Sequence, residues 1–544
     1  MKFPVHSFTL LTTAALVLPG SAGLIYSNLQ DISIPANFDG VYLNVETGAF
    51  NNDSMAPVAG WDVNPFFGGS AIWNAPAFQP VRAGTTGSSA VLNLATGTIV
   101  DGSSVFSTAV QGPGGETPGG PAYGASDTHM GAGAGQFQNG QEGYFGFKLN
   151  GTNYGWMRVV FDSTGTGLIK DWAYDDSGAQ IAVGNITNTG NVVTADSTSG
   201  NFTVGSIITN ALATTSFVKT GSGTVTLTAG NTFTGTASVN QGTLVLDHNN
   251  GALVDTVAVV VASGATLALN NHNQTIGSLA GVAGSSVDLA NKRLVIGANN
   301  ADTTFAGVIS QSGGGAELHK TGTGTLTLTG ANTYTGHTEV LGGKLAVNGS
   351  LASALITVKN GATLEGTGSM ISTGTLKIEA NSTLAAGGVV TIESLASGNL
   401  ELLADAVFAF DMDKNAAPSA AADLMAVTGN FTLATDNQSI LSLSELGGPT
   451  GEWTIGEKLT LLSYSGTWNG GLFEYGGNAV ANNSTISFSG MDWLFQYNDS
   501  VAGSNFATDL TGSSYVTMTA IPETSVTLLG SLASLLLLRR RREN

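Results

Sequence analysis

The chain has 544 residues, of which 10% are charged, 75 are glycine and none is cysteine. Without cysteine no disulfide can form, so an exported form would depend on backbone hydrogen bonds and packed apolar side chains. The formal charge of −20 argues against nucleic acid as a partner, because an acidic surface repels phosphate backbones. With 42% hydrophobic residues the chain is also not a disordered acidic chain.

The first 23 residues have the layout of a secretory signal peptide. A basic start at Lys2 precedes an apolar stretch over residues 8–18, and small residues follow at 20–23. This layout predicts cleavage after Ala22 or Gly23 and export of the remaining chain.

Residues 24–190 are rich in tryptophan and phenylalanine, which indicates a globular core between two sheets. Two alternating segments, 143–149 and 154–161, are separated by Asn150-Gly151, a strong signal for a β-hairpin. We interpret this part of the chain as a β-sandwich-like domain.

A repeat organises the middle of the chain. The segment 219–235 recurs 101 residues later at 320–336, and 15 of the 26 positions from 219 to 244 are identical to their counterparts. Apolar residues alternate with threonine in both copies. This period of 2 predicts half-buried strands in which Leu227 and Leu328 point inward and the threonines outward.

Similar strand starts continue at intervals of about 20 residues, roughly the length of one coil of a parallel β-helix. These starts are centred on Leu244, Leu267, Leu345, Leu364 and Leu384. We therefore predict a right-handed parallel β-helix over residues 200–395, with repeat copies at 217–248 and 318–349. The copies resemble the autotransporter-associated β-strand repeat, and this resemblance implies a passenger-type β-helix without implying any catalytic activity.

Residues 396–520 contain further strand-like segments without the repeat. The clearest are 400–410 and 460–464, and aromatic residues are frequent around them. Because a solenoid needs atypical terminal coils to close its apolar stack, we predict the last coils and a cap here.

The tail, residues 521–544, carries a short apolar run of about 13 residues, whereas a helix that spans a bilayer needs about 20. The basic flank would hold this end in the cytoplasm. The features in order are Pro522, Glu523, Thr524, the apolar run, Arg539, Arg540, Arg541 and Arg542.

This order resembles the PEP-CTERM sorting signal of Gram-negative bacteria, although Thr524 stands where that family most often has proline. The resemblance implies processing by an exosortase, a membrane protease-transpeptidase, after transient anchoring in the inner membrane. Proteins of this group often carry the β-sandwich module that residues 170–184 resemble.

Four short patterns resemble chemical sites, and a structural interpretation is favoured for each. The segment Ser216–Lys219 fits a Ser-x-x-Lys nucleophile pattern but lies in the repeat. Asp411–Asn415 begins like a calcium loop but lacks its glycine and its final glutamate. Asp175–Asp176 fits a turn, and the run 131–135 lacks the flanking strand and helix of a phosphate loop. We predict no catalytic residue, cofactor or metal.

Two function classes remain. The first is a non-catalytic protein of the cell surface or extracellular matrix, adhesin-like or associated with extracellular polysaccharide. The alternative is a β-helical polysaccharide lyase or glycoside hydrolase. Such lyases use clustered carboxylates and basic side chains, whereas residues 200–395 hold few charges, so we favour the first class.

Overall fold

The computed structural model describes residues 23–66, 71–85, 89–106, 128–129, 137–138, 140–161, 166–210, 214–359, 361–370, 374–387, 392–446 and 451–522. The chain divides into two compact units, one up to His248 and one from Asn249. In the described ranges nearly all regular structure is strand, and the single helical segment is the 3-10 turn η2 (Pro418–Ala420). The predicted all-β class is confirmed. No helix within these ranges has the length and apolar character needed to cross a membrane.

Unit 1 begins with mainly antiparallel strands. They are β1 (Leu24–Tyr26), β2 (Ile32–Ile34), β3 (Tyr42–Leu43), β4 (Phe50–Asn51), β5 (Val63–Phe66), β6 (Ala71–Asn74), β7 (Phe78–Pro80), β8 (Ile99–Val100), β9 (Thr128–His129), β10 (Phe137–Gln138), β11 (Glu142–Leu149), β12 (Asn153–Phe161), β13 (Gly167–Asp175) and β14 (Ile181–Ala182). One sheet has the order β1-β13-β12-β11-β7, and a smaller one has the order β4-β3-β5-β6.

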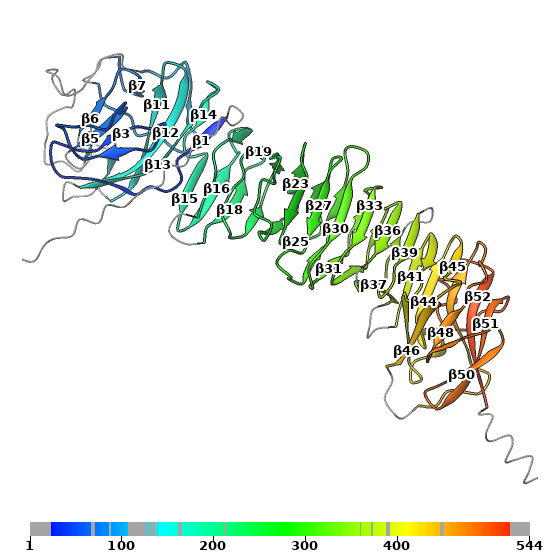
Figure 1. Ribbon diagram of the computed structural model, residues 1–544. Coiled ribbons are helices and arrows are strands. Elements are labelled where there is room, and N and C mark those ends of the chain that lie inside the picture. The colour runs from blue at the N-terminus through cyan, green and yellow to red at the C-terminus, as the bar shows by residue number, and fades with distance from the viewer. Residues whose placement is uncertain are drawn as a thin grey trace, which may run out of the picture. The chain divides into compact units, whose positions relative to one another are not determined.

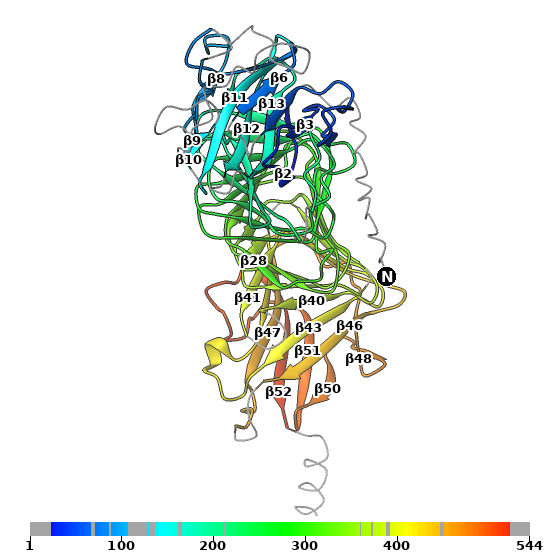
Figure 2. The ribbon, with the colours of Figure 1, turned by 90° about the vertical axis from the view of Figure 1, so that its left-hand side faces the viewer.

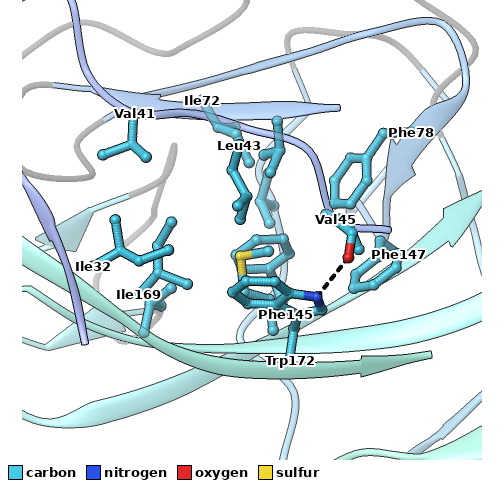
Figure 3. Close-up of a cluster of buried hydrophobic side chains, with 14 of the residues drawn as sticks. Ile32, Val41, Leu43, Val45, Ile72, Phe78, Phe145, Phe147, Ile169 and Trp172 are labelled. Carbon is cyan, nitrogen blue, oxygen red and sulfur yellow. Dashed lines mark hydrogen bonds between the residues drawn. The ribbon is translucent and has the colours of Figure 1, made fainter. Parts of the chain in front are cut away.

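Buried side chains from both of these sheets form one apolar cluster, part of which is drawn in Figure 3. Phe78 stacks on Phe147 with ring centroids 4.6 Å apart. The indole nitrogen of Trp172 donates a hydrogen bond of 2.9 Å to the carbonyl of Val45. The ring is therefore buried without leaving its N–H group unpaired. The interpretation of residues 24–190 as a β-sandwich-like domain stays a prediction.

The predicted hairpin at Asn150-Gly151 is confirmed. Strands β11 and β12 pair antiparallel from Glu142 opposite Val160 to Leu149 opposite Asn153. Residues 150–152 connect the two strands, and the backbone nitrogen of Thr152 donates to the carbonyl of Leu149 at 3.2 Å. The central residues of this turn, Asn150 and Gly151, have left-handed φ angles of 51° and 80°.

The remaining strands of unit 1 form parallel coils. They are β15 (Ile186–Thr189), β16 (Val192–Asp196), β17 (Phe202–Val204), β18 (Ser216–Thr220), β19 (Thr224–Leu227), β20 (Ala237–Val239) and β21 (Thr243–Leu246). The ladders β16-β18-β20 and β17-β19-β21 are parallel. Strand β1 pairs antiparallel with β13 and parallel with β17, so the N-terminal sheet continues directly into the first coil.

A buried ionic network joins the same parts of unit 1. Arg158 on β12 binds both carboxylate oxygens of Asp171 on β13, and its Nη2 also donates to the carbonyl of Asn188 on β15 at 2.6 Å. Tyr26 on β1 donates its hydroxyl to Asp171 at 2.8 Å. Since the buried charges are paired and hydrogen-bonded, the network can fix the first coil against the N-terminal sheet without leaving an uncompensated ion.

Unit 2 is a parallel β-solenoid whose coils contribute one strand to each of three faces. The first face comprises β22 (Ala258–Val261), β25 (Ser278–Gly281), β28 (Thr303–Phe305), β31 (Thr325–Leu328), β34 (Lys344–Val347), β37 (Thr363–Gly366), β40 (Thr383–Ala386), β43 (Val407–Met412), β46 (Ser439–Glu445) and β48 (Phe473–Tyr475).

The second face comprises β23 (Thr266–Leu269), β26 (Ser286–Asp288), β29 (Val308–Ser310), β32 (Ala331–Asn332), β35 (Ser350–Leu351), β38 (Ser369–Met370), β41 (Ser394–Ser397), β44 (Leu424–Val427) and β47 (Lys458–Tyr464). The third is an eight-stranded sheet of β24 (Gln274–Ile276), β27 (Arg293–Ile296), β30 (Glu317–Lys320), β33 (His337–Val340), β36 (Leu355–Val358), β39 (Thr375–Ile378), β42 (Asn399–Leu402) and β45 (Phe431–Leu433). Its strands follow one another in chain order (Figure 1).

Stacked apolar side chains fill the interior of these coils. On the first face the register aligns Leu326, Leu345, Leu364, Leu384 and Phe408, and all five are buried. Their spacing in sequence grows where a loop lengthens a coil, but the strand register is kept. The predicted parallel β-solenoid is thus confirmed. Leu345, Leu364 and Leu384, which mark predicted strand starts, point into its interior.

Antiparallel strands close the C-terminal end of unit 2. They are β49 (Asn478–Ala479), β50 (Ser484–Phe488), β51 (Met491–Asp499) and β52 (Ser514–Ile521). Strand β52 pairs with β47 and continues that sheet as β47-β52-β51-β50 (Figure 2). Aromatic side chains cover the last coils, with Phe473 stacked on Phe408 at 5.8 Å and Trp468 on Tyr497 at 4.8 Å.

Candidate functional site

The lysine that begins each repeat copy points into the solenoid. Lys219 and Lys320 are 0% and 1% exposed. The Nζ of Lys219 donates to the carbonyls of Thr220, Gly221 and Gln241 at 2.9, 2.7 and 2.7 Å. Burial lowers the pKa of both amines to about 8. Each lysine therefore ties the turn after its own strand to the turn of the next coil.

The asparagine of each copy has a similar role. Asn332 accepts a hydrogen bond from the backbone nitrogen of Ile309 at 3.0 Å, and its Nδ2 donates to the carbonyls of Gly330 and Ser350, both at 3.1 Å. Asn231 in the first copy accepts from Ile208 at 2.8 Å in the same way. The repeat asparagine thus satisfies backbone groups that the bends between strands would otherwise leave unpaired.

Glycine at the start of the following strand completes the repeat geometry. Gly242 and Gly343 have φ angles of 67° and 60°. A Cβ at Gly242 would lie 2.3 Å from the carbonyl oxygen of Gly223 in the preceding coil. These positive φ angles place both glycines in tight turns, and the recurring repeat residues thus serve coil closure.

Outward positions of the third face carry a charged ladder, which we define as Arg293, Glu317, His319, Glu339 and Lys359. Arg293 Nε lies 2.6 Å from Glu317, and His319 lies 3.4 Å from Glu317 and 3.7 Å from Glu339. Lys359 lies 3.0 Å from Glu339. The hydrogen bond from Arg293 lowers the pKa of Glu317, and burial lowers that of His319. The ladder links four successive coils and gives this face a mixed-charge, hydrogen-bonding surface.

The short sequence patterns that resemble chemical sites either have their side chains apart or serve a structural role. Ser216 and Lys219 lie three positions apart on strand β18 and therefore face opposite sides, so they form no nucleophile pair. Asp175 accepts backbone hydrogen bonds from Ser177 and Ala179 in a turn, and Asp176 accepts one from Gly23. The run 131–135 lies outside the described residues.

The segment Asp411–Asn415 does not form a loop of convergent carboxylates. Asp411 is buried at the end of β43, and Asp413 accepts a hydrogen bond of 2.8 Å from the backbone nitrogen of Asn415. Within the described ranges no group of three or more His, Asp or Glu side chains is arranged to hold a metal ion.

Asp411 and Asp423 form a buried acidic pair near the C-terminal cap. Asp423 Oδ2 accepts from the backbone nitrogen of Asp411 at 2.9 Å, while Asp411 Oδ2 has no hydrogen-bond partner among the described residues. Burial raises the pKa of Asp423 to about 9 and that of Asp411 to about 6. No sequence pattern indicates this pair, because Asp423 reaches Asp411 only through the loop between β43 and β44.

We expect this pair to make the C-terminal cap less stable as pH rises. Both carboxyls bind protons more tightly in the folded state than in the unfolded chain, whose aspartates have a pKa of about 3.9, so the free energy of unfolding falls between pH 4 and 9. Asp411→Asn should reduce this loss by roughly 1–3 kcal/mol between pH 5 and 8. Urea denaturation at both pH values measures it, and an unchanged pH slope in the variant would contradict the assignment.

The predicted processing residues lie at the limits of the described chain. Gly23 is buried directly before β1, and Pro522 follows β52. Ala22, Glu523, Thr524, Arg539, Arg540, Arg541 and Arg542 lie outside the described residues.

Comparisons with known proteins identify the repeat. Residues 217–246 and 318–347 match the family described as Passenger-associated-transport-repeat. The chain is also 32% identical over 258 residues to a protein of Brucella suis biovar 1 (strain 1330) called "Adhesin BmaC autotransporter". The alignment covers 42% of this chain and 7% of that relative, so the chain spans a small part of its length. The solenoid therefore carries two copies of the passenger-associated-transport repeat. The buried lysines Lys219 and Lys320 lie in equivalent positions within the two copies.

Proposed function

We propose that this chain is a non-catalytic, adhesin-like protein of the cell surface or extracellular matrix. The observation that carries the proposal is the inward orientation of the repeat residues: Lys219, Lys320, Asn231 and Asn332 close the coils, so the solenoid is a stable scaffold whose outward faces are left for contact. The adhesin similarity supports the same class. Extracellular polysaccharide is the proposed ligand, and the charged ladder is a suitable hydrogen-bonding face.

The purified chain should bind one or more members of an extracellular glycan panel without cleaving them. Immobilised protein is incubated with each glycan, bound sugar is measured, and the supernatant is analysed for shortened products. Binding with unchanged chain length supports the adhesin proposal. Shortened or unsaturated products would overturn it in favour of the polysaccharide lyase or hydrolase, and no binding to any glycan would remove polysaccharide as the ligand.

We propose that the chain is exported and that its signal peptide is cleaved after Ala22. The backbone nitrogen of Gly23 donates a hydrogen bond of 2.6 Å to Asp176 Oδ1. After cleavage at this position the new α-ammonium of Gly23 would lie beside that carboxylate, a charge-assisted contact that cleavage one residue later would remove. Mass spectrometry of the exported protein should find Gly23 as its first residue, and a mature chain that starts at Leu24 would contradict this.

At the other end we propose sorting by an exosortase in a Gram-negative cell, with transient anchoring in the inner membrane through the tail. Replacing Pro522 and Glu523 with alanine leaves the apolar run and the arginines in place, so membrane insertion should persist while processing stops. The variant should accumulate at full length in the inner membrane. Mass spectrometry decides the matter, because an intact Arg539–Arg542 segment on wild-type surface protein would identify the tail as a permanent anchor.

A further inference from the structure

Unit 1 contains a second buried arginine, and among the described residues no carboxylate pairs with its charge. Arg82 follows β7 and is 2% exposed. Its Nη1 donates to the carbonyl of Ser89 at 2.8 Å, and its Nη2 has one long contact of 3.5 Å with Asn74 Oδ1. Its Nε has no hydrogen-bond partner. The guanidinium therefore meets only neutral oxygens through these bonds.

Arg158 in the same unit shows how such a group is normally satisfied. It is 1% exposed, and its Nε and Nη2 donate to the two oxygens of Asp171 at 2.8 and 2.7 Å. This is the parallel two-bond arrangement that suits a planar guanidinium and a carboxylate. The edge of Arg82 formed by Nε and Nη2 is the equivalent edge, and there it has only the long contact with Asn74.

The electrostatics of the two arginines differ in the corresponding way. The carboxylates of Asp171 and Glu142 raise the pKa of Arg158 despite its burial, whereas burial alone lowers the pKa of Arg82 to about 10. Arg82 still stays charged at neutral pH. A buried cation without a counter-ion is costly, and it is retained at lower cost when an anion occupies its donor edge.

We propose that Arg82 is the anchor of a binding site for a carboxylate anion. The Nε and Nη2 groups donate two parallel hydrogen bonds to the carboxylate, as Arg158 does to Asp171. The anion is a free monocarboxylate or the uronate group of an acidic saccharide. The site lies just below the surface, since Ala83 and Thr85 beside Arg82 are exposed. This site does not depend on the adhesin proposal.

The test titrates the purified full-length chain with sodium acetate, glucuronate and sulfate at constant ionic strength. Isothermal calorimetry measures binding, and thermal unfolding measures the linked stabilisation. A carboxylate at about 100 times its Kd should raise the Tm of unit 1 by about 5–10 °C. Arg82→Met should abolish binding. Arg82→Lys should weaken binding at least tenfold, because lysine keeps the charge but cannot donate two parallel hydrogen bonds from a planar group. Lys344→Met, at a basic residue of unit 2 that is 40% exposed and lies outside the charged ladder, should bind like the wild type.

Each outcome has a defined meaning. Equal affinity for acetate and glucuronate identifies a general carboxylate site, and much tighter glucuronate binding identifies an acidic saccharide as the source. Sulfate binding as tight as that of both carboxylates would overturn the carboxylate assignment. Absence of binding by the wild type, or binding that Arg82→Met retains, would overturn the site itself. If Arg82→Met fails to fold, Arg82→Lys decides the assignment, because it keeps the buried charge, and binding as tight as that of the wild type would overturn the site.

Discussion

Leu328→Asp should destabilise the solenoid by more than about 4 kcal/mol, because it places an unpaired carboxylate in a dry interior. Leu328 is 0% exposed and lies in register between Phe305 and Val347, which belong to the preceding and following coils. Neither neighbour can donate a hydrogen bond to the new charge through its side chain. Chemical denaturation followed by circular dichroism should show the lower midpoint.

Thr327→Asp is the matched control for this substitution. Thr327 is adjacent on the same strand but points outward, with Thr304 and Ala346 as its register partners. A carboxylate there remains hydrated, and the loss should be below about 1 kcal/mol. Leu227 and Thr226 give the same comparison in the first repeat copy. Equal losses for the inward and outward variants would be incompatible with the orientation of these strands.

Lys320→Met should cost about 2–4 kcal/mol although the side chain keeps a similar length. The Nζ of Lys320 donates to the carbonyls of Thr321, Gly322 and Gly342 at 2.6, 3.4 and 3.2 Å. Methionine would leave these buried acceptors without that donor while keeping most of the packing. Denaturation midpoints at pH 7, where a group with a pKa of about 8 is mostly charged, measure the effect.

Lys344→Met provides the control for Lys320, since Lys344 belongs to the same repeat copy but points outward. Its side chain is 40% exposed and pairs with Glu365 at 3.3 Å. Exposed ion pairs contribute little, so this substitution should cost less than about 1 kcal/mol. If Lys344→Met destabilised the chain as much as Lys320→Met, the buried carbonyl contacts would not be the source of the stability.

Local sequence signals were sufficient for the strands and their inward faces. Alternation around Leu227 and Leu328 places apolar groups on one side of a strand, and the coil-length spacing of similar starts then requires stacking, because a single coil cannot bury its own apolar side. The Asn150-Gly151 turn could also be predicted from the sequence, since few other dipeptides adopt the left-handed conformation at both residues at low energetic cost. These features depend on neighbours in the chain.

The role of the repeat lysines could have been found by the same alternation. Lys219 is two positions after buried Phe217, and Lys320 is two positions after buried Leu318, so period 2 places both amines on the inward side. Lysine is rarely buried, and this general preference argues against an inward position. The carbonyl oxygens that make burial acceptable come from turns about one coil away.

By itself, the sequence determined that this protein is all-β, that its middle is a stacked parallel solenoid and that its repeat leucines are interior, because these properties follow from periodicity along the chain. Only the tertiary structure decided which polar groups are paired. Arg158 finds Asp171 across a strand pair and Asn188 on the first coil, whereas Arg82 meets no carboxylate through its described hydrogen bonds. Pairing of buried charges depends on contacts between distant segments, and such contacts have no period in the sequence.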